Sequence, residues 1–462
     1  HERITVDACA PYAEREFCVN ARVTEYPDDR DSCTLLYVKL DDPGLPKVKT
    51  LIIDYGKSCG SFEPGDEVRV NIKLHSAAER YGEETDSNIS KDIYLTGYTS
   101  DPIEKTGTWE YSFLYFPKNI GNALHSRIRE LYPDDTAPFM LALLSGYKGD
   151  YYENDRLYAS MSISGLAHVV AVSGMHVAFL VGVLQSIMGK NRRSSILCIG
   201  LVWAFVVMVG SPPSAVRAGI MLSLLLLTPI IGRVNDRATS LSFALALILI
   251  SNPFAAGSIS LQLSFGAMAG IFLFSQPVYE YLSGRISPPA FMEPAVRYAL
   301  AALSSSLAVT VFTAPLAAVY FGYVSLLAPA VNVMCLWAIS LLFTGGYAVC
   351  AVGIAVPALG GVLAEALSYL VRYIALVVEY TAKLALAAVY IENPYVSAWL
   401  VLTYLLFAAF LALRRGKKKL SPLLPCALSV IFLMGVFWVT RRDMLADEGT
   451  ISIMDVGSGQ CI

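Results

Sequence analysis

The sequence predicts a membrane all-α polytopic bundle of about 8–11 helices, some of them broken or re-entrant, preceded by an N-terminal small β-barrel. Composition is the first reason, because 55% of the 462 residues are hydrophobic and only 16% are charged, against about 25% charged in soluble chains. The second reason is the charge distribution: residues 1–110 carry a net −9, with 13 Lys and Arg against 22 Asp and Glu, and the remainder carries +6. These features argue against a single soluble enzyme and exclude disordered, collagen-like and coiled-coil chains.

The polar head, residues 1–108, is predicted to be an extracytoplasmic β domain. Five short runs rich in Val, Ile, Leu and Tyr are separated by turn-forming residues such as Asp, Pro and Gly. These runs are 17–25, 33–40, 48–54, 67–74 and 92–99. Five strands in so short a segment indicate a small barrel, most simply an OB-like one. The pattern does not separate an OB-like barrel from an SH3-like barrel.

Four of the nine cysteines lie in this head, within about fifty residues. They allow two disulfides in an oxidising compartment, or four reduced thiols in a cytosolic one. The absence of a CxxC spacing argues against a zinc site. If one bridge forms, the preferred pair is Cys18 and Cys59, which would join the first predicted strand to the end of the third.

Residues 109–158 are predicted to form an amphipathic interfacial connector, because aromatic and charged residues alternate there with apolar ones. Residues 159–445 form the polytopic region. Several of its apolar runs exceed the ~20 residues that cross a bilayer, whereas 238–251 and 345–357 are too short and are expected to be re-entrant or broken. The basic cluster at 414–419 belongs on the cytoplasmic side, so the C-terminal end is expected outside the cytoplasm. Disulfides in the head would place the head on that outer side too.

The first candidate segment for function contains His168 and His176, eight residues apart, with Ser173 between them. Ionisable residues at membrane depth are costly and often mark a transport pathway. The alternative is a pair of neutral histidines that hydrogen-bond between helices. A Ser/His hydrolase is a further alternative, although no oxyanion-hole signal accompanies these residues.

The second candidate segment is an interrupted helix. Pro212 and Pro213 must break a helix, Ser214 is placed to cap a new one, and Arg217 follows one turn later. A helix N-terminus with exposed N–H groups, a hydroxyl and an arginine is suited to binding an anion within the membrane. The alternative is a proline kink with the arginine extended to the membrane interface.

A third feature is the run 357–390, in which Glu365, Arg372 and Glu379 recur every seven residues and so share one helix face. This spacing predicts an amphipathic helix that lies at the interface or packs in the bundle through ion pairs. Lining of a pore is the alternative.

Two segments, HVVAVSGMHVAFLV and GSPPSAVRAGIML, resemble the paired signatures of ComEC-type competence proteins, the inner-membrane channels of natural transformation. Their order along the chain makes the resemblance specific, and it extends over nearly the whole sequence. The positions that match include His168, Ala171, Ser173, Gly174, His176, Pro213, Ser214, Ala215, Arg217, Ala218, Gln262, Ser264 and Asn332.

The end of the chain, ISIMDVGSGQCI, is similar to the opening strand of the metallo-β-lactamase-like domain that follows the channel in many of these proteins. That opening usually reads DVGQGD, from which Ser458 and Gln460 depart. We therefore expect residues 446–462 to be the first strand of a truncated domain of this kind. The resemblance assigns no catalytic residue, metal or cofactor to this chain, and a divalent metal would belong to the remainder of that domain.

The resemblance implies a DNA-uptake channel in the cytoplasmic membrane that passes single-stranded DNA and works with a DNA receptor protein and a cytoplasmic helicase or motor. A polyanion needs sparse donors along its path, because a strongly basic tube would trap it. A secondary transporter or flippase of another anionic substrate remains an alternative, as does the Ser/His hydrolase. The net −9 of the head opposes direct DNA contact. The candidate path residues are His168, Ser173, His176, Ser214, Arg217, Gln262, Ser264 and Asn332.

Overall fold

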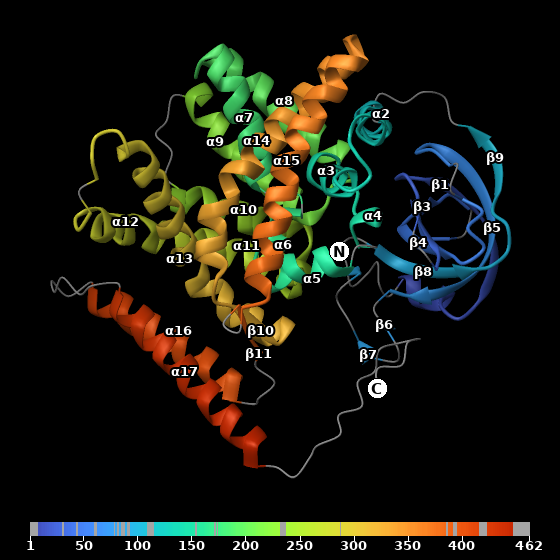
Figure 1. Cartoon of the computed structure of the whole chain (residues 1–462). Coiled ribbons are helices and arrows are strands. Elements are labelled where there is room, and N and C mark those ends of the chain that lie inside the picture. The colour runs from blue at the N-terminus through green and yellow to red at the C-terminus, as the bar shows by residue number, and fades with distance from the viewer. Residues whose placement is uncertain are drawn as a thin grey trace. The chain divides into compact units, whose positions relative to one another are not determined.

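A computed structural model of the chain (Figure 1) divides it into two compact units, residues 1–268 with 327–384, and residues 269–326 with 385–462. The first unit holds a β-barrel and most of the helices, and the second holds a smaller group of helices. The residues described are 8–29, 32–42, 45–59, 62–77, 79–80, 83–84, 88–89, 93–108, 115–152, 155–170, 172, 174–231, 237–286, 288–384, 387–390, 395–414 and 423–446.

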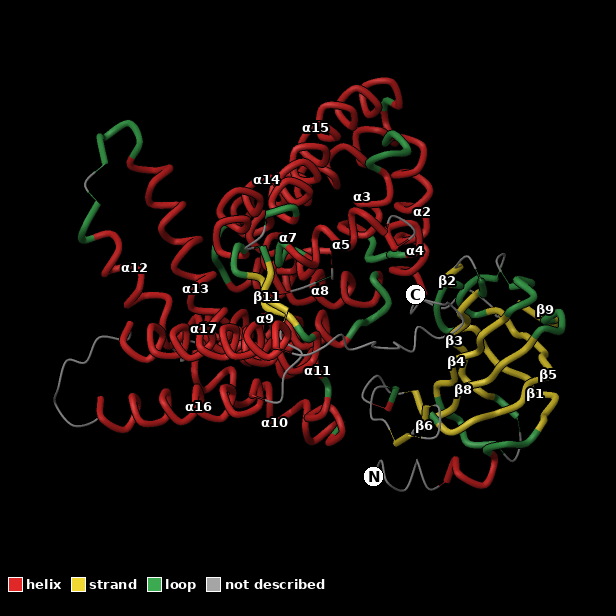
Figure 2. Tube along the Cα trace, turned by 60° about the horizontal axis from the view of Figure 1, so that its bottom comes forward, coloured by secondary structure: helices red, strands yellow, loops and turns green. Residues whose placement is uncertain are grey.

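Five strands close the N-terminal barrel, which is the group of yellow strands on the right of Figure 2. They follow the order β1-β3-β4-β8-β5, and β5 pairs back onto β1 in antiparallel register from Glu16↔Lys73 to Arg22↔Glu67. The pairing of β4 with β8 is parallel. This closed Greek-key path confirms the OB-like barrel. The strands are β1 (Glu16–Val23), β3 (Thr34–Leu40), β4 (Lys49–Asp54), β5 (Asp66–Ser76) and β8 (Ile93–Thr99).

Shorter elements complete the domain. The sequence pattern missed β9, because its five residues EKTGT are mostly polar and lack the alternation of a half-buried strand. It nevertheless pairs with the first part of the long strand β5. The short elements are η1 (Ala10–Tyr12), β2 (Asp28–Asp29), β6 (Glu79–Arg80), β7 (Glu83–Glu84) and β9 (Glu104–Thr108).

Alternating side chains fill the barrel. Along β5 every second residue points inward, and Val68, Val70, Ile72 and Leu74 are each at most 2% exposed. Each such side chain contributes ~1.5–3 kcal/mol when it is fully removed from water. The charged residues between them remain on the outer face of the strand, so the charged surface and the apolar core come from one period-two pattern.

The preferred disulfide is not present in this structure, because no bond joins the Cys18 and Cys59 sulfurs. Cys18 lies on the outer face of β1, where the Arg69 Nε donates to its Sγ at 3.1 Å. Cys59 is fully buried in the barrel core. The alternation of β1 therefore directs the first thiol outward and away from the core in which the second lies.

A maleimide reagent is expected to modify Cys18 in the folded protein and to leave Cys59 unmodified until the barrel unfolds. Mass spectrometry of the two peptides, with and without denaturant, measures this difference. The electrophoretic mobility of Cys18→Ala should match that of the parent chain without reductant. A mobility shift on reduction that Cys18→Ala abolishes would show that the bridge exists after all.

The helices of the first unit surround an apolar segment, α3, which is buried along nearly all of its length. A helix that is hydrophobic all round belongs in a core, so this part of the predicted interfacial connector is interior. Helix α2 precedes it and packs on α3, α8 and α14. The helices are α2 (Phe116–Leu131), α3 (Ala137–Leu144), α4 (Gly149–Tyr152), α5 (Asp155–Ile163), α6 (Ala167–Val170), α7 (Gly174–Met188), α8 (Arg192–Met208), α9 (Pro213–Ile231), α10 (Arg237–Ser251), η4 (Pro253–Gly257), α11 (Ile259–Gly270), α14 (Ala328–Ala355) and α15 (Pro357–Ala382).

Helices α14 and α15 form a hairpin whose close approach depends on glycine. A Cβ on Gly360 would lie 2.5 Å from the Gly353 Cα, and a Cβ on Gly353 would lie 2.6 Å from the Leu131 Cδ1 of α2. The segment 345–357, expected to be a separate short span, is the continuous end of α14 and its junction with α15. That expectation is therefore wrong, since the glycine-rich stretch serves packing rather than a break.

The charged stripe of α15 ties this helix to the connector. Arg372 donates to Asp135 at 2.8 and 3.2 Å and to Glu365 at 2.9 Å. About two turns farther along, Glu379 accepts from Arg156 of α5 at 2.9 Å. The charged residues Glu365, Arg372 and Glu379 thus make the ion pairs expected of a helix packed in a bundle. The hydrogen bonds from Arg372 lower the pKa of the Asp135 carboxyl.

The second unit is a group of helices with an aromatic core. Rings of Phe274, Phe312 and Phe407 lie with centroids 5.2–6.1 Å apart. The α13 helix packs on the π-helical turn η5 and on α16, and α16 packs on α17. The elements are η5 (Ile271–Ser275), α12 (Gln276–Ser283), α13 (Glu293–Phe321), β10 (Tyr323–Ser325), β11 (Ala388–Tyr390), α16 (Tyr395–Arg414) and α17 (Leu423–Ala446).

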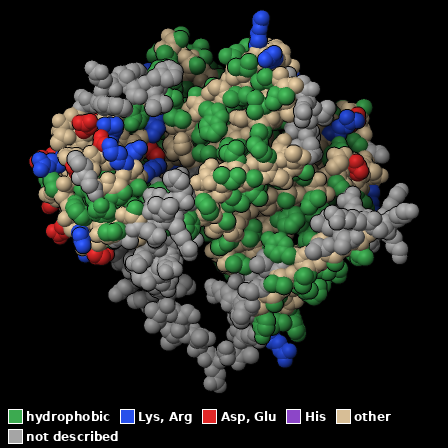
Figure 3. All heavy atoms as spheres, turned by 180° about the vertical axis from the view of Figure 1, so that it is seen from behind, with side chains coloured by type: hydrophobic (Ala, Val, Ile, Leu, Met, Phe, Trp, Pro, Cys, Tyr) green, Lys and Arg blue, Asp and Glu red, His purple; other side chains and the backbone are tan. Residues whose placement is uncertain are grey.

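Among the described residues, four helices are long and apolar enough to cross a membrane, and further apolar helices are shorter. Figure 3 shows hydrophobic side chains spread over the helical surface, whereas charged side chains gather on the barrel. The predicted class, a membrane helical bundle with an N-terminal barrel, is confirmed. The long spans are Ile259–Ser283, Glu293–Phe321, Ala328–Ala355 and Pro357–Ala382, and the shorter ones are Gly174–Met188, Ser214–Thr228, Ala238–Ser251 and Ala427–Val439.

Two adjacent glycines of α15 provide a matched test of the hairpin. Gly360→Ala is expected to lower stability by ~1–3 kcal/mol, because the new methyl group overlaps the α14 backbone. Gly361→Ala, at a position with nothing within 4 Å, should raise stability by ~0.5–1 kcal/mol through helix propensity alone. Thermal melting in detergent measures both, and equal melting temperatures for the two variants would contradict the close approach.

Candidate functional site at the junction of the barrel and the bundle

The turn between α8 and α9 is the interruption that the two prolines predict. Gly210 and Ser211 both have positive φ, +82° and +53°. Helix α9 begins at Pro213, and the Pro212 carbonyl accepts from the N–H groups of Ala215 and Val216. The prediction that Ser214 caps the helix is therefore wrong, since Ser214 is the second residue of α9.

The Ser214 hydroxyl instead joins two broken segments. Its Oγ donates to the carbonyl of Val172 at 2.7 Å, in the short link between α6 and α7. A carbonyl at a helix break lacks its intrahelical donor, so this bond compensates one interruption with a side chain from the other. The two motifs singled out in the sequence therefore meet through this hydrogen bond.

Arg217 lies one turn inside α9 and is only 3% exposed. One terminal guanidinium nitrogen donates to the carbonyl and to the hydroxyl of Ser260, at 2.8 and 3.0 Å. Its buried Nε has no hydrogen-bond partner, and no described carboxylate pairs with the side chain. An uncompensated buried N–H costs free energy, so this arginine keeps unused hydrogen-bonding capacity in the interior.

A cavity of about 590 Å³ lies beside Arg217. Its walls come from three parts of the first unit: barrel strands, the connector after α3, and the broken helices around α9. The lining residues used below are Glu25, Tyr26, Asp28, Tyr37, Lys49, Tyr147, Lys148, Ser211, Ser214, Arg217 and Asn252.

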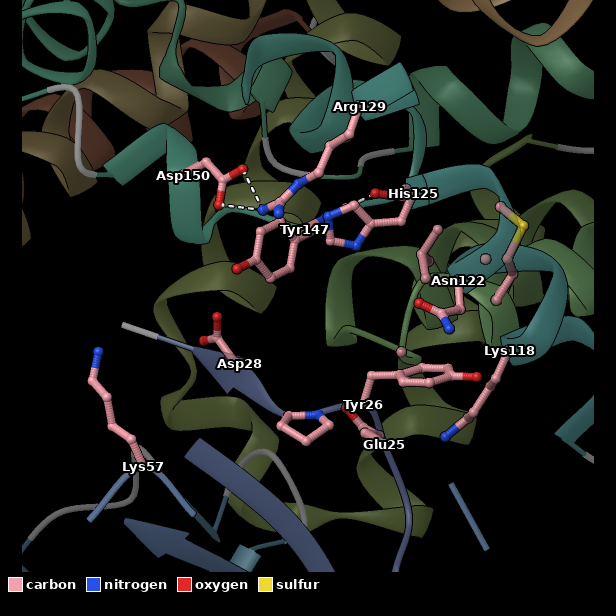
Figure 4. A pocket seen from close by; sticks show the side chains of 17 residues that line it. Glu25, Tyr26, Asp28, Lys57, Lys118, Asn122, His125, Arg129, Tyr147 and Asp150 are labelled. Carbon is pink, nitrogen blue, oxygen red and sulfur yellow. Dashed lines mark hydrogen bonds and ion pairs between the residues drawn. The ribbon is translucent and has the colours of Figure 1, made fainter. Parts of the chain in front are cut away.

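A second cavity of about 440 Å³ adjoins it, and Figure 4 shows the polar side chains around this space. Arg129 of α2 donates to both carboxylate oxygens of Asp150, at 2.7 and 2.9 Å. The His125 and Tyr147 rings lie 4.5 Å apart between their centroids. The residues that line both cavities, and so mark the neck between them, are Glu25, Tyr26, Asp28, Gly146, Tyr147, Val209 and Gly210.

The barrel loop that follows β1 forms one side of the neck. Its Tyr26 hydroxyl donates to the Asn119 Oδ1 of α2 at 3.2 Å, and the Lys118 Nζ donates to the Thr24 carbonyl. On the other side of the larger cavity, the Asn252 amide donates to the Ile89 carbonyl at 3.1 Å. Side-chain bonds at both ends therefore hold the barrel against the helices.

The cavities are basic although the barrel domain is acidic. Basic side chains outnumber carboxylates by six to three among their lining residues. Burial lowers the pKa of Lys148, which has no ion pair or hydrogen bond with a described residue. The basic residues are Lys49, Lys57, Lys118, Arg129, Lys148 and Arg217, and the acidic ones are Glu25, Asp28 and Asp150.

Of the sequence-predicted path residues, Ser214 and Arg217 line the larger cavity. His168 is exposed, with its Nδ1 3.0 Å from the Gly165 carbonyl. His176 is fully buried, 4.9 Å from the Phe343 ring, and Asn332 is buried in α14. These three residues line neither cavity, so their place on a path stays a prediction.

The remaining candidates lie elsewhere. The Gln262 amide of α11 donates to the Ala256 carbonyl at 3.0 Å. Ser264 lies on the same helix and lines neither cavity, and Ser173 is outside the described residues. Sequence reasoning missed Tyr37, Lys49 and Lys148, because a half-buried residue of a strand or loop carries no local signal of the distant segment it faces.

Comparison with known proteins gives the family. The family model described as "Competence protein" matches residues 143–418, more than half of the chain. The chain belongs to the competence protein family. It is 26% identical over 168 residues to ComE operon protein 3 of Bacillus subtilis (strain 168), a match that covers 36% of this chain and 21% of that relative. The chain therefore matches about a fifth of that relative's length, and no solved structure matches it.

The family match begins at the end of α3 and contains the Arg217 wall of the larger cavity, while the barrel wall lies outside it. The competence-family region thus supplies the buried arginine and the broken helices. The barrel adds Tyr37 and Lys49 from outside the matched residues. The described residues of both parts contain no group of three His, Cys, Asp or Glu that could hold a metal ion.

Lys148 provides a chemical test of the cavity. Because burial lowers its pKa, its amine is expected to become acylated by acetic anhydride with a pH midpoint below the ~10.4 of an ordinary lysine. Mass spectrometry after brief labelling across a pH series gives the midpoint. Lys190, an exposed residue before α8, serves as the reference, and identical profiles for the two lysines would contradict the burial.

Proposed function

We propose that this protein is a transmembrane channel through which single-stranded DNA crosses the cytoplasmic membrane during natural transformation. The observation that carries the proposal is the buried Arg217, which lines the basic cavity near the start of an interrupted helix and whose Nε has no hydrogen-bond partner. Membership of the competence family supports a role in DNA uptake. A phosphate oxygen is the acceptor that a guanidinium in this position lacks.

The number and placement of the hydrogen-bond donors favour movement of a DNA strand over its tight retention. Arg217 is the one cation that the α9 wall contributes to the larger cavity, and neighbouring walls contribute Lys49 and Lys148. Every phosphate contact adds affinity that must be lost again when the strand moves on. A few cations from separate walls attract a polyanion without trapping it.

Aromatic side chains beside these cations are suited to bases. Tyr37, Tyr26 and Tyr147 all line the larger cavity, and the Lys49 Nζ lies 5.1 Å from the centre of the Tyr37 ring. Stacking on an aromatic ring is tolerant of base identity and contributes ~1–3 kcal/mol per base. The cavity volume of about 590 Å³ is within the range of small-ligand sites, ~300–1,000 Å³. The cavity is therefore of a size suited to a nucleotide of a single strand.

In the proposed orientation the barrel lies outside the cytoplasm, on the side that the basic loops predict for the C-terminal end. A DNA receptor protein would then deliver the strand on the barrel side, and a cytoplasmic helicase or motor would draw it inward. In this scheme the chain is a passive conduit with no catalytic residue. The predicted strand at 446–462 lies almost wholly outside the described residues.

Arg217→Glu is expected to reduce transformation by on the order of 10–100-fold, because it removes a charge-assisted contact worth about 1.5–3 kcal/mol and adds repulsion. Arg217→Gln should show the loss without the added negative charge. A deletion strain complemented with each variant gives the measurement. Import of the single strand is scored separately from binding of double-stranded DNA at the surface.

Arg193→Gln is the matched control, because Arg193 is exposed at the start of α8 and lines neither cavity. Immunoblots of the membrane fraction establish that each variant accumulates. Normal single-strand import by both Arg217 variants, at parental protein levels, would refute the assignment of this cavity to the DNA path.

A further inference from the structure

We infer that Glu25 is a built-in anion that occupies the neck between the two cavities, and that the phosphates of an incoming strand displace it from its cations. This inference rests on the proposed function and deepens it, because it identifies a residue of the barrel that sets which anions enter. Glu25 is one of the few residues that line both cavities.

The Glu25 carboxylate is held where a phosphate would bind. Its Oε1 lies 2.7 Å from the Lys49 Nζ, with the glutamate side chain 21% and the lysine side chain 31% exposed. Its Oε2 lies against Gly210, 3.3 Å from the position a Cβ would take. The carboxylate thus lies between a barrel cation and the turn that leads into α9.

A second cation, Lys118, also interacts with the Glu25 charge. Burial lowers the pKa of Lys118, repulsion from Lys49 adds to that shift, and attraction to Glu25 opposes it. Lys118 and Lys49 come from α2 and β4, so Glu25 screens two cations that would otherwise repel each other across the neck. Removal of the carboxylate leaves two cations for one anionic ligand.

The loop that carries Glu25 is fixed, so only its side chain has to move. The loop is bonded to α2 through Tyr26 and through the Thr24 carbonyl, on either side of Glu25. A carboxylate is a hydrogen-bond acceptor of the same kind as a phosphodiester and carries the same single negative charge, but a strand presents several such charges at once. A polyanion that contacts several cations at once outcompetes it, whereas a small monovalent anion gains little by replacing it.

Displacement would also complete a nucleotide subsite. Lys49 lies over the Tyr37 ring, so a lysine released from Glu25 can contact a phosphate while the adjacent base stacks on the tyrosine. Glu25 therefore competes for the same cation that the strand uses. Its loss should increase both affinity and the number of phosphate contacts.

The experiment measures binding of a fluorescein-labelled 15-nucleotide oligo-dT to the full purified chain in detergent by anisotropy. Glu25→Gln should bind about 3–10-fold more tightly at low salt, because a like charge near the ligand is removed. The slope of log affinity against log salt should steepen by about 0.7, the value for one added contact on a single strand. Glu25→Ala should do the same, which separates charge from side-chain shape.

Asp41→Asn is the matched control, since Asp41 also pairs with a lysine, Lys47, at 2.9 Å but lines neither cavity. Its affinity should remain within about twofold of the parent, because exposed charges at a distance are screened. If Glu25→Gln matches the parent, or if Asp41→Asn tightens binding equally, the inference is overturned. If the inference fails but Arg217→Gln still weakens DNA binding, the proposed function stands. If the affinity of Arg217→Gln is also unchanged, the proposed function itself is overturned.

Discussion

The buried guanidinium of Arg217 is the constraint on which the arrangement around the junction depends. A charge in a membrane-embedded bundle is costly unless polar partners surround it. Here Ser260 supplies two acceptors, and Arg217 lines a cavity with other polar side chains. The arginine therefore requires both the first turn of α11 and an open, polar space beside α9. The interrupted helix provides that space, because its prolines prevent α8 and α9 from continuing as one rod.

The acidic composition of the barrel and the basic character of the cavities are compatible, because a net charge does not describe a local surface. Acidic residues of the outer barrel face pair with nearby cations, as Asp41 does with Lys47 and Arg22. The loop and strand that face the helices instead place Lys49 and Lys57 in the cavity walls. The electrostatic argument against DNA contact therefore applies to the outer face of the domain and not to the face at the junction.

Rigid packing supports the walls of the cavity. The α14–α15 hairpin holds α3 in the core, and the Tyr347 hydroxyl of α14 donates to the Leu144 carbonyl at 2.6 Å, just before the Gly146–Tyr147 wall. The ion pairs of Arg372 hold α15 to the same connector. The lining residues of the neck are therefore set by helices whose own positions are determined by close glycine contacts.

The sequence by itself determined the strands of the barrel, within one or two residues at most ends, and the helix break at Pro212 and Pro213, because alternation and proline act locally. It also identified Ser214 and Arg217. Only the tertiary structure decided that Cys18 and Cys59 stay apart, that α3 is interior, and that Glu25, Lys49 and Lys148 join Arg217 at one cavity. The physical reason is that these residues lie about 70–190 positions from Arg217 on separate elements, so their proximity follows from how the barrel packs on the helices.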